Sequence, residues 1–387
     1  MNKNVFKELS LENHQKSFEI LPSNRVKVVV NLNNLRDNFK TIKALNPNKK
    51  IISIIKSNAY GHGIVEVAKT LEKSDYFGTT DLKEAYCLRQ NKIKTPIVVM
   101  SGIWNEYDFF VSIEQNIHLV VYEESQLEKI SMLAKKTKKN IQMWVKIDSG
   151  MNRLGIMSQR AEIVLRQLAE NPFVKSIVVM THFANADNTN KGEMDKQRKS
   201  WAKIIKKIND IAKITCLTTA NSSTVLNYNE DTGDIIRPGL ILYGIVPKIK
   251  GGPKQIINLK QVMTLKSSVI SIKKVSTGEA VGYGSRWKAK RDSMIAIGAI
   301  GYGDGYDRHM SDGTPVLVNG QKAMLAGRVS MNMISIDVTD CKNINIGDEV
   351  IVFGEELPLN ELEKINDFSA YDVIISAGSK APIEYKV

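Results

Sequence analysis

The chain has 387 residues, of which 43% are hydrophobic and 25% are charged, and this composition is typical of a globular protein with room for two domains. Lysine and arginine number 54 against 41 acidic residues, a formal net charge of +13. The excess is mostly lysine spread along the chain, which favours a solvated surface and leaves nucleic-acid binding as a distant alternative. No run approaches the roughly 20 apolar residues that span a bilayer, so we predict a cytoplasmic protein.

Three cysteines, Cys87, Cys216 and Cys341, are far apart in the sequence and odd in number. No Cys-x-x-Cys pair is present. The pattern argues against a disulfide framework and against a structural zinc site, and we predict no metal.

An N-terminal extension is predicted over residues 1–24, and a barrel domain over 25–255. In that domain short Val/Ile-rich runs alternate with segments of helical period such as 161–172 and 197–213. Continuous apolar strands separated by amphipathic helices indicate a parallel sheet covered by helices. About eight such units favour an α/β fold of the closed (β/α)8 type. The runs are at residues 27–33, 51–56, 95–100, 117–121, 141–147, 176–182, 214–220 and 233–239.

A second, mostly β domain is predicted over residues 256–387, where the pattern changes to strand-like alternation with turn signals. Asn319-Gly320 between two apolar runs predicts a hairpin. A Gly-Asp turn in 344–354 precedes another strand, and 359–367 predicts one helix.

Polar residues follow the predicted barrel strands, where the catalytic groups of such barrels lie. A partly buried lysine such as Lys56 has a lowered amine pKa and can form a Schiff base, which suggests a carbonyl substrate or pyridoxal phosphate. The segments 221–223 and 238–240 offer hydroxyl and N–H donors for a phosphate. Each feature alone is common, and only their shared position supports a site. The strand-end residues are Lys56, Lys146, Arg153, His182, Asn221, Ser222 and Arg237.

Several motifs in the chain resemble those of bacterial alanine racemases. The most specific is IIKSNAYGHG, which matches the family's pyridoxal phosphate attachment signature. The resemblance begins near residue 25 and covers nearly all the rest of the chain. It implies an eight-stranded barrel followed by a β domain, a homodimer, pyridoxal 5'-phosphate as cofactor, and supply of D-alanine for peptidoglycan. Further matches are VKIDSGMNRLG, MTHFANAD, ANSS, IRPGLILYG, VGYGSRW, IGYGDGYDR and AGRVSMNM.

The resemblance also implies roles for individual residues. Lys56 resembles the lysine that carries the cofactor and acts as one catalytic base, and Tyr283 resembles the opposing base from the partner subunit. Inversion at Cα requires two bases on opposite faces of a planar carbanion. His182 and Arg237 resemble the network beside the cofactor, with Arg237 at the ring nitrogen.

Substrate and cofactor binding are implied in the same way. Arg153 resembles the arginine that holds the substrate carboxylate, and Lys146 matches a position that is carbamylated in many relatives. Met331 falls where the family has a partner-subunit backbone contact to the substrate. The residues implied to contact the phosphate are Tyr60, Ser222, Gly239, Leu240 and Tyr371. The residues implied to line the entrance to the site are Asp187, Tyr302, Arg308 and Arg328.

Two departures from the family pattern bear on substrate choice. Asn332 stands where alanine racemases usually have aspartate, and the tail at 375–385 lacks the expected arginine-containing ending. A racemase of broader specificity, or one for serine, lysine or arginine, is therefore the alternative on the same scaffold. Amino-acid decarboxylases share the barrel type, but the motif around Tyr283 favours racemisation. A noncatalytic cofactor carrier is a third reading, against which the β domain argues.

Overall fold

The computed structural model describes residues 25–387 except 103–104, 189–190 and 250–251. The extension predicted over 1–24 lies outside the described residues. The chain forms two compact units. One comprises Asn31–Met263 with Lys386–Val387, and the other comprises Thr264–Tyr385 together with the described residues that precede Asn31.

The first unit is a barrel of eight parallel strands in the order β10-β2-β3-β4-β5-β6-β8-β9, with the short β7 (Ile156–Met157) paired to β6. The two ends of this path also meet. The Arg237 N–H donates to the Ala220 carbonyl at 2.9 Å, and the Asp234 N–H donates to the Leu217 carbonyl at 2.8 Å. The predicted barrel is therefore confirmed. Its strands are β2 (Lys50–Ile54), β3 (Tyr76–Thr79), β4 (Ile97–Val99), β5 (Ile117–Val121), β6 (Ile141–Asp148), β8 (Val174–Met180), β9 (Ile214–Thr218) and β10 (Ile235–Ile236).

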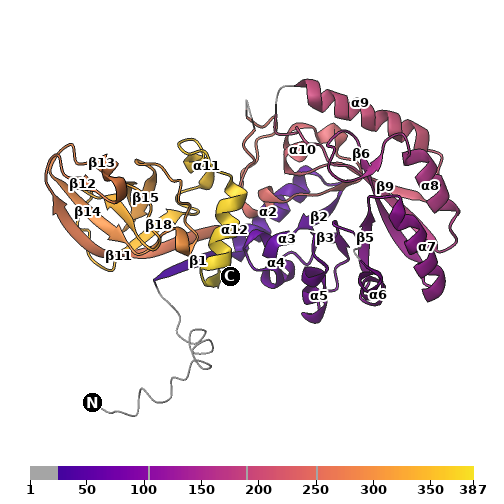
Figure 1. The fold of residues 1–387 in the computed structure, drawn as a ribbon, viewed down its shortest axis with the longest axis horizontal. Helices are drawn as coiled ribbons and strands as arrows, with labels where there is room; N and C mark the ends of the chain where they lie inside the picture. The colour runs from indigo at the N-terminus through magenta and orange to yellow at the C-terminus, as the bar shows by residue number, and fades with distance from the viewer. Residues whose placement is uncertain (1–24, 103–104, 189–190, 250–251) are drawn as a thin grey trace, which may run out of the picture. The chain divides into compact units, whose positions relative to one another are not determined.

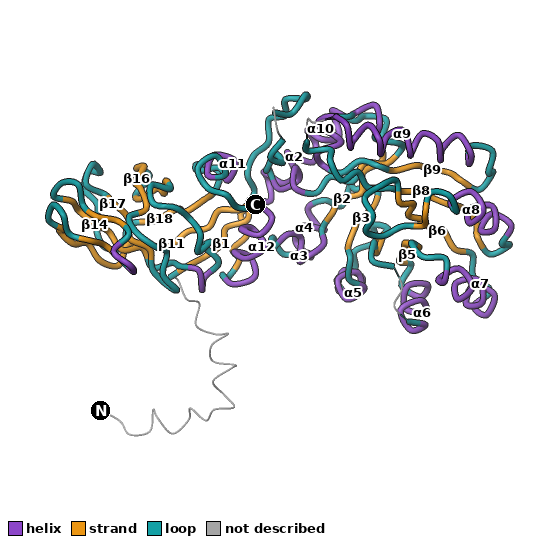
Figure 2. The backbone as a smooth tube through the Cα atoms, turned by 45° about the horizontal axis from the view of Figure 1, so that its top comes forward, coloured by secondary structure: helices purple, strands orange, loops and turns teal. Residues whose placement is uncertain are grey.

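Helices cover the outside of these strands (Figures 1 and 2). Each buries one apolar side, as in α8, where Val164, Leu165 and Leu168 are buried. Asn31, Asp81 and Asn105 cap three of the helices by accepting backbone N–H groups through their side chains. No helix in the described part of the chain has the length and apolarity needed to cross a membrane. The main helices are α2 (Leu32–Leu45), α4 (Ile64–Thr70), α5 (Leu82–Gln90), α6 (Glu106–Glu114), α7 (Ser125–Thr137), α8 (Ala161–Glu170), α9 (Lys191–Ile208) and α10 (Ser222–Asn227).

The second unit is built on an eight-stranded sheet in the order β14-β17-β16-β15-β18-β11-β1-β19. The predicted hairpin is present, because Val318 pairs with Gln321 and both Asn319 and Gly320 have positive φ, as a type I′ turn requires. The helix predicted over 359–367 is present but shorter, as α11 (Leu359–Leu362). The strands are β1 (Val26–Asn31), β11 (Met263–Val275), β14 (Ser293–Gly298), β15 (Pro315–Val318), β16 (Gln321–Leu325), β17 (Ile334–Asp337), β18 (Glu349–Phe353) and β19 (Ile383–Lys386), with β12 (Ala280–Val281) and β13 (Trp287–Lys288) as a separate pair.

One strand prediction was wrong. The run at 27–33 was counted among the barrel strands, but β1 lies in the second sheet, where the Val28 N–H donates to the Pro382 carbonyl at 2.9 Å. Its side chains alternate between buried and half-buried, whereas four of the five residues in β2 are buried. The barrel strand missing from the prediction is β3, whose four residues YFGT are too few to show a pattern. The helix α12 (Ala370–Lys380) was also missed.

Candidate active site

Lys56 lies one residue beyond Ile55 at the carboxyl end of β2, at the start of a short left-handed turn labelled α3 (Lys56–Tyr60). Four successive residues after it have φ between 51° and 54°. Each non-glycine residue in this conformation costs roughly 1–2 kcal/mol, so the surrounding structure must hold the turn in place. These residues are Ser57, Asn58, Ala59 and Tyr60.

Side chains from inside and outside the turn hold it. The Glu84 carboxylate on α5 accepts the Asn58 N–H at 2.7 Å, and Asn58 Oδ1 accepts the Ile64 N–H at 2.8 Å. His62 Nδ1 lies 3.0 Å from the carbonyls of both Ala59 and Tyr60, and since carbonyls only accept, this nitrogen carries the proton. The turn therefore presents Lys56 on a fixed backbone.

Tyr60, Ser222 and Gly239 meet beside this turn although they come from three segments. The Gly239 N–H donates to Ser222 Oγ at 3.0 Å. A Cβ on Gly239 would lie only 2.7 Å from the Tyr60 hydroxyl oxygen, so any larger residue there would force Tyr60 to shift. Leu240 follows at the start of the short helix η2 (Leu240–Tyr243). The hydroxyls of Tyr60 and Ser222 thus lie beside a loop in which Gly239 has no side chain. Hydroxyl and N–H donors without bulky neighbours are what a phosphate requires.

The buried Arg237 contacts the half-buried His182 in the barrel unit. Arg237 donates to Thr218 Oγ1 at 2.5 Å, to the carbonyls of Thr181 and Thr219, and to His182 Nδ1 at 3.3 Å. Burial lowers the pKa of Arg237 to about 10, which leaves it charged at neutral pH. Burial, and then the Arg237 charge, lower the pKa of His182 to about 3, so the imidazole is neutral.

Two further cations complete the barrel site. Lys146 on β6 is 8% exposed, and burial followed by the charges of Arg153 and Arg237 lowers its pKa to about 8. Burial and then Arg153 also lower the pKa of Lys56. Arg153 lies in the loop after β6, where Asp148 Oδ1 accepts backbone N–H groups of residues 150–152. Mutually repelling cations at one site favour an anionic ligand.

The second unit contributes a cavity of about 740 Å³. Five residues predicted for the site line it together. Tyr283 is 70% exposed and Met331 is 58% exposed, while the Arg308 guanidinium lies 5.4 Å from the centre of the Tyr302 ring. The five residues are Tyr283, Tyr302, Arg308, Arg328 and Met331, and Arg286, His309, Ser311, Val329 and Ser330 complete the lining.

Three predicted residues lie apart from this cavity lining. Asn332 follows Met331, but its amide donates to the Asp304 carboxylate at 3.2 Å. Tyr371 is 39% exposed in the first turn of α12, and Asp187 is exposed in the barrel unit. No group of three or more His, Cys, Asp or Glu residues in the described part of the chain could hold a metal ion.

Sequence reasoning missed the residues that support the site. Glu84, Asp304 and Arg25 each contact loops that carry predicted residues, but they belong to segments with no chemical signature of their own. The GYGDGYDR motif was the one available signal for Asp304.

A parallel (β/α)8 barrel with a cationic site at its strand ends, joined to an antiparallel β unit, defines a two-domain barrel enzyme. Residues 30–247 match the family described as "Alanine racemase, N-terminal domain", and residues 262–385 match "Alanine racemase, C-terminal domain". The chain belongs to the alanine racemase family, and it is accordingly an isomerase.

Individual relatives agree with this assignment. An alanine racemase of Edwardsiella ictaluri is 36% identical over 353 residues, covering 91% of this chain and 95% of that protein. One from Coxiella burnetii is 39% identical over 363 residues, covering 91% and 96%. The crystal structure of the biosynthetic alanine racemase from Pseudomonas aeruginosa superposes with a TM-score of 0.85 at 31% identity, covering 94% of this chain and all of that one.

Proposed function

We propose that this chain interconverts L- and D-alanine with pyridoxal 5'-phosphate as cofactor, by a two-base mechanism. The observation that carries the proposal is that Lys56 begins the turn that ends at Tyr60, whose hydroxyl lies beside Gly239, and that the Gly239 N–H in turn donates to Ser222 Oγ. The relatives named above are alanine racemases.

The barrel residues fit the cofactor's chemistry. Tyr60, Ser222 and the backbone at Gly239 and Leu240 would hold the phosphate, with Tyr371 as a further contact. Lys56 would hold the cofactor aldehyde, and burial, followed by the charge of Arg153, lowers the pKa of its amine in the direction that favours this bond. Arg237 would donate to the ring nitrogen, and because it stays charged it does not give up its proton. When bound, the cofactor supplies an electron sink for negative charge at the substrate Cα.

Two bases then exchange the Cα proton on opposite faces. Lys56 Nζ removes or returns the proton on the face of the D-isomer, and Tyr283 Oη does so on the face of the L-isomer. We propose that Tyr283 is supplied by the partner subunit of a homodimer. Its 70% exposure on its own chain supports this assignment, because a catalytic phenol is otherwise well covered.

The substrate carboxylate is assigned to Arg153 and to the backbone of Met331 from the partner subunit. An arginine fork matches a carboxylate with two parallel hydrogen bonds. Lys146, with its pKa lowered to about 8, has a reactive amine fraction near neutral pH. Carbamylation there, in which the neutral amine adds carbon dioxide and releases a proton, would convert a cation into an anion that could orient Arg153. Tyr302, Arg308, Arg328 and Asp187 would line the entrance.

We further propose that the enzyme works in the cytoplasm and supplies D-alanine for peptidoglycan. The alternative is a broad-specificity racemase, or one for serine, lysine or arginine, on the same scaffold. The engagement of Asn332 by Asp304 supports alanine, because the residue that departs from the family pattern is turned to its own unit's loops rather than lining the cavity.

A substrate panel tests the proposal. The purified chain is loaded with pyridoxal phosphate and given each L-amino acid in turn, and the D-product is measured by chiral chromatography. We expect alanine to give the highest kcat/KM. Faster turnover of serine, lysine or arginine would favour the alternative, and absence of any D-product would contradict racemase activity. Borohydride should fix the cofactor to wild-type chain and not to Lys56→Ala.

A further inference from the structure

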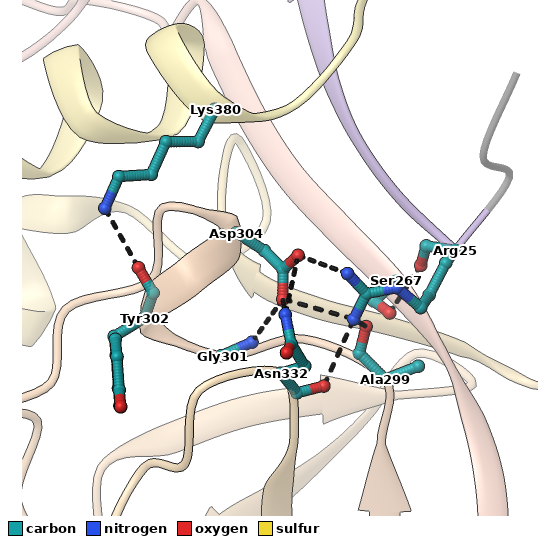
Figure 3. A network of polar contacts seen from close by, with 8 residues as sticks. All are labelled: Arg25, Ser267, Ala299, Gly301, Tyr302, Asp304, Asn332 and Lys380. Atoms are coloured by element: carbon teal, nitrogen blue, oxygen red, sulfur yellow. Dashed lines mark hydrogen bonds and ion pairs between the residues drawn. The ribbon is translucent and has the colours of Figure 1, made fainter. Parts of the chain in front are cut away.

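A polar network in the second unit joins three segments that are far apart in the sequence (Figure 3). Arg25, just before β1, donates to the Ala299 carbonyl at 3.0 Å and to the Asn332 carbonyl at 3.2 Å. The same guanidinium forms an ion pair with Asp304. One arginine therefore bridges the loop that follows β14 and the loop that precedes β17.

Asp304 is the centre of this network. It is 9% exposed, and besides Arg25 it accepts the Gly301 N–H at 3.0 Å and the Asn332 amide at 3.2 Å. A carboxylate has about four acceptor sites, and these donors occupy them. If any one of these donors is lost, the nearly buried Asp304 carboxylate has an unsatisfied acceptor site, which is energetically unfavourable.

The two loops that Asp304 and Arg25 join are packed backbone to backbone. The Gly303 N–H donates to the Met331 carbonyl at 2.7 Å, and the Tyr302 N–H donates to the Ser330 carbonyl at 3.1 Å. A Cβ on Gly301 would lie 2.1 Å from the Ser330 carbonyl oxygen, so the loops cannot approach more closely. The position of Met331 is thus set by the loop that carries Asp304.

We propose that Arg25 and Asp304 are positioning residues for substrate binding, acting through Asn332 on the backbone of Met331. The inference rests on the proposed function, in which Met331 contacts the substrate carboxylate. Neither side chain is among the residues that line the cavity, so both act through the loops and not by contact. Asn332, in place of the family's aspartate, suits this arrangement because its amide donates to Asp304, where a second carboxylate would repel it.

The test uses the full chain loaded with pyridoxal phosphate and compares Arg25→Met, Asp304→Asn and their double variant. The substrate carboxylate is bound equally in the ground state and in the transition state. Loss of a contact to it therefore raises KM and leaves kcat nearly unchanged. We expect KM for alanine to rise about tenfold in each single variant, the usual size for a lost hydrogen bond to a charged group. The double variant should be no worse than either single one, because the two residues act as a unit.

Two further variants control for general destabilisation. Lys27→Met removes an exposed ion pair with Glu384 near the same end of the chain, and we expect unchanged KM and kcat. Arg25→Lys keeps the charge without the planar fork and should recover part of the affinity. Unchanged KM in Arg25→Met and Asp304→Asn, with only the Tm lowered, would overturn the proposal in favour of a purely structural role.

Hydrogen exchange separates this proposal from the proposed function. The Gly303 amide, bonded to the Met331 carbonyl, should exchange about tenfold faster in Asp304→Asn than in the unaltered chain or in Lys27→Met. A wild-type chain that makes no D-alanine contradicts the proposed function alone. Equal exchange rates contradict the positioning role, whatever the activity.

Discussion

Tyr283 has the role that depends most on a single functional group. Its hydroxyl is the proposed base for the L-isomer, and the ring is 70% exposed, so replacing it by phenylalanine leaves the fold unchanged. We expect Tyr283→Phe to lower racemisation by at least about a hundredfold, the usual contribution of a general base. Chiral chromatography from each enantiomer measures this, with the cofactor's absorbance unchanged.

Tyr107→Phe is a matched control, because Tyr107 is 74% exposed in the barrel unit and has no proposed role. Its rates should equal those of the unaltered chain. Rates for Tyr283→Phe within a small factor of wild type in both directions would remove the two-base mechanism.

Gly239 tests the proposed phosphate site. A methyl group there would lie 2.7 Å from the Tyr60 hydroxyl and would force that hydroxyl to move. Overpacking of this kind costs about 1–3 kcal/mol, so we expect the Kd for pyridoxal phosphate to rise at least about fivefold in Gly239→Ala. Fluorescence titration of the cofactor-free chain measures the Kd.

Gly192→Ala serves as the control for this substitution, because a Cβ at Gly192 meets nothing within 4 Å. An unchanged Kd in Gly239→Ala would mean that the phosphate is bound elsewhere in the chain.

At the scale of the element, the left-handed turn after Lys56 is the most unusual feature. Ser57 is exposed and has φ of 54°, a conformation that glycine adopts without strain and that is rare for β-branched residues. Ser57→Gly should therefore raise the free energy of unfolding by about 0.5 kcal/mol, a figure that includes the greater entropy of glycine in the unfolded chain. Ser57→Val should lower the free energy of unfolding by at least about 1 kcal/mol.

Urea unfolding of the two variants beside wild type measures the difference. The same side chain is replaced in both, so loss of its own contacts cancels in the comparison. Equal free energies of unfolding for the glycine and valine variants would show that residue 57 does not keep its left-handed conformation, and this would contradict the prediction.

At the scale of the whole molecule, three neutral histidines in the barrel unit make the chain sensitive to acid. Burial lowers the pKa of His62 and of His118 to about 4, and burial with Arg237 lowers that of His182 to about 3. Unfolded histidines titrate near 6.5. Between about pH 6.5 and 4 the unfolded chain binds more protons than the folded one, so stability falls as pH falls.

Each histidine contributes a slope of up to about 1.4 kcal/mol per pH unit. Because His118 is outside the site, His118→Gln should reduce the slope near pH 5.5 by about 1 kcal/mol per pH unit, as measured by urea unfolding of the cofactor-free chain. An unchanged slope in His118→Gln would show that His118 titrates normally in the folded state.

The barrel class could be predicted from the sequence, because apolar strands buried on both faces alternate along the chain with segments of helical period. It also predicted which side chains follow the strands, since a strand's carboxyl end and the residue after it are adjacent in the chain. The motif IIKSNAYGHG made the family resemblance specific. Family membership agrees with that resemblance.

Which distant segments meet could be seen only in the folded chain. The alternation in β1 does not say which sheet it joins, and its partner Pro382 is at the other end of the chain. Arg25 and Asp304 are 279 residues apart, and each is an ordinary charged residue in its own segment. The left-handed turn likewise depends on Glu84 from α5. Hydrogen bonds and charge pairs act over a few ångströms of space, and sequence records only distance along the chain.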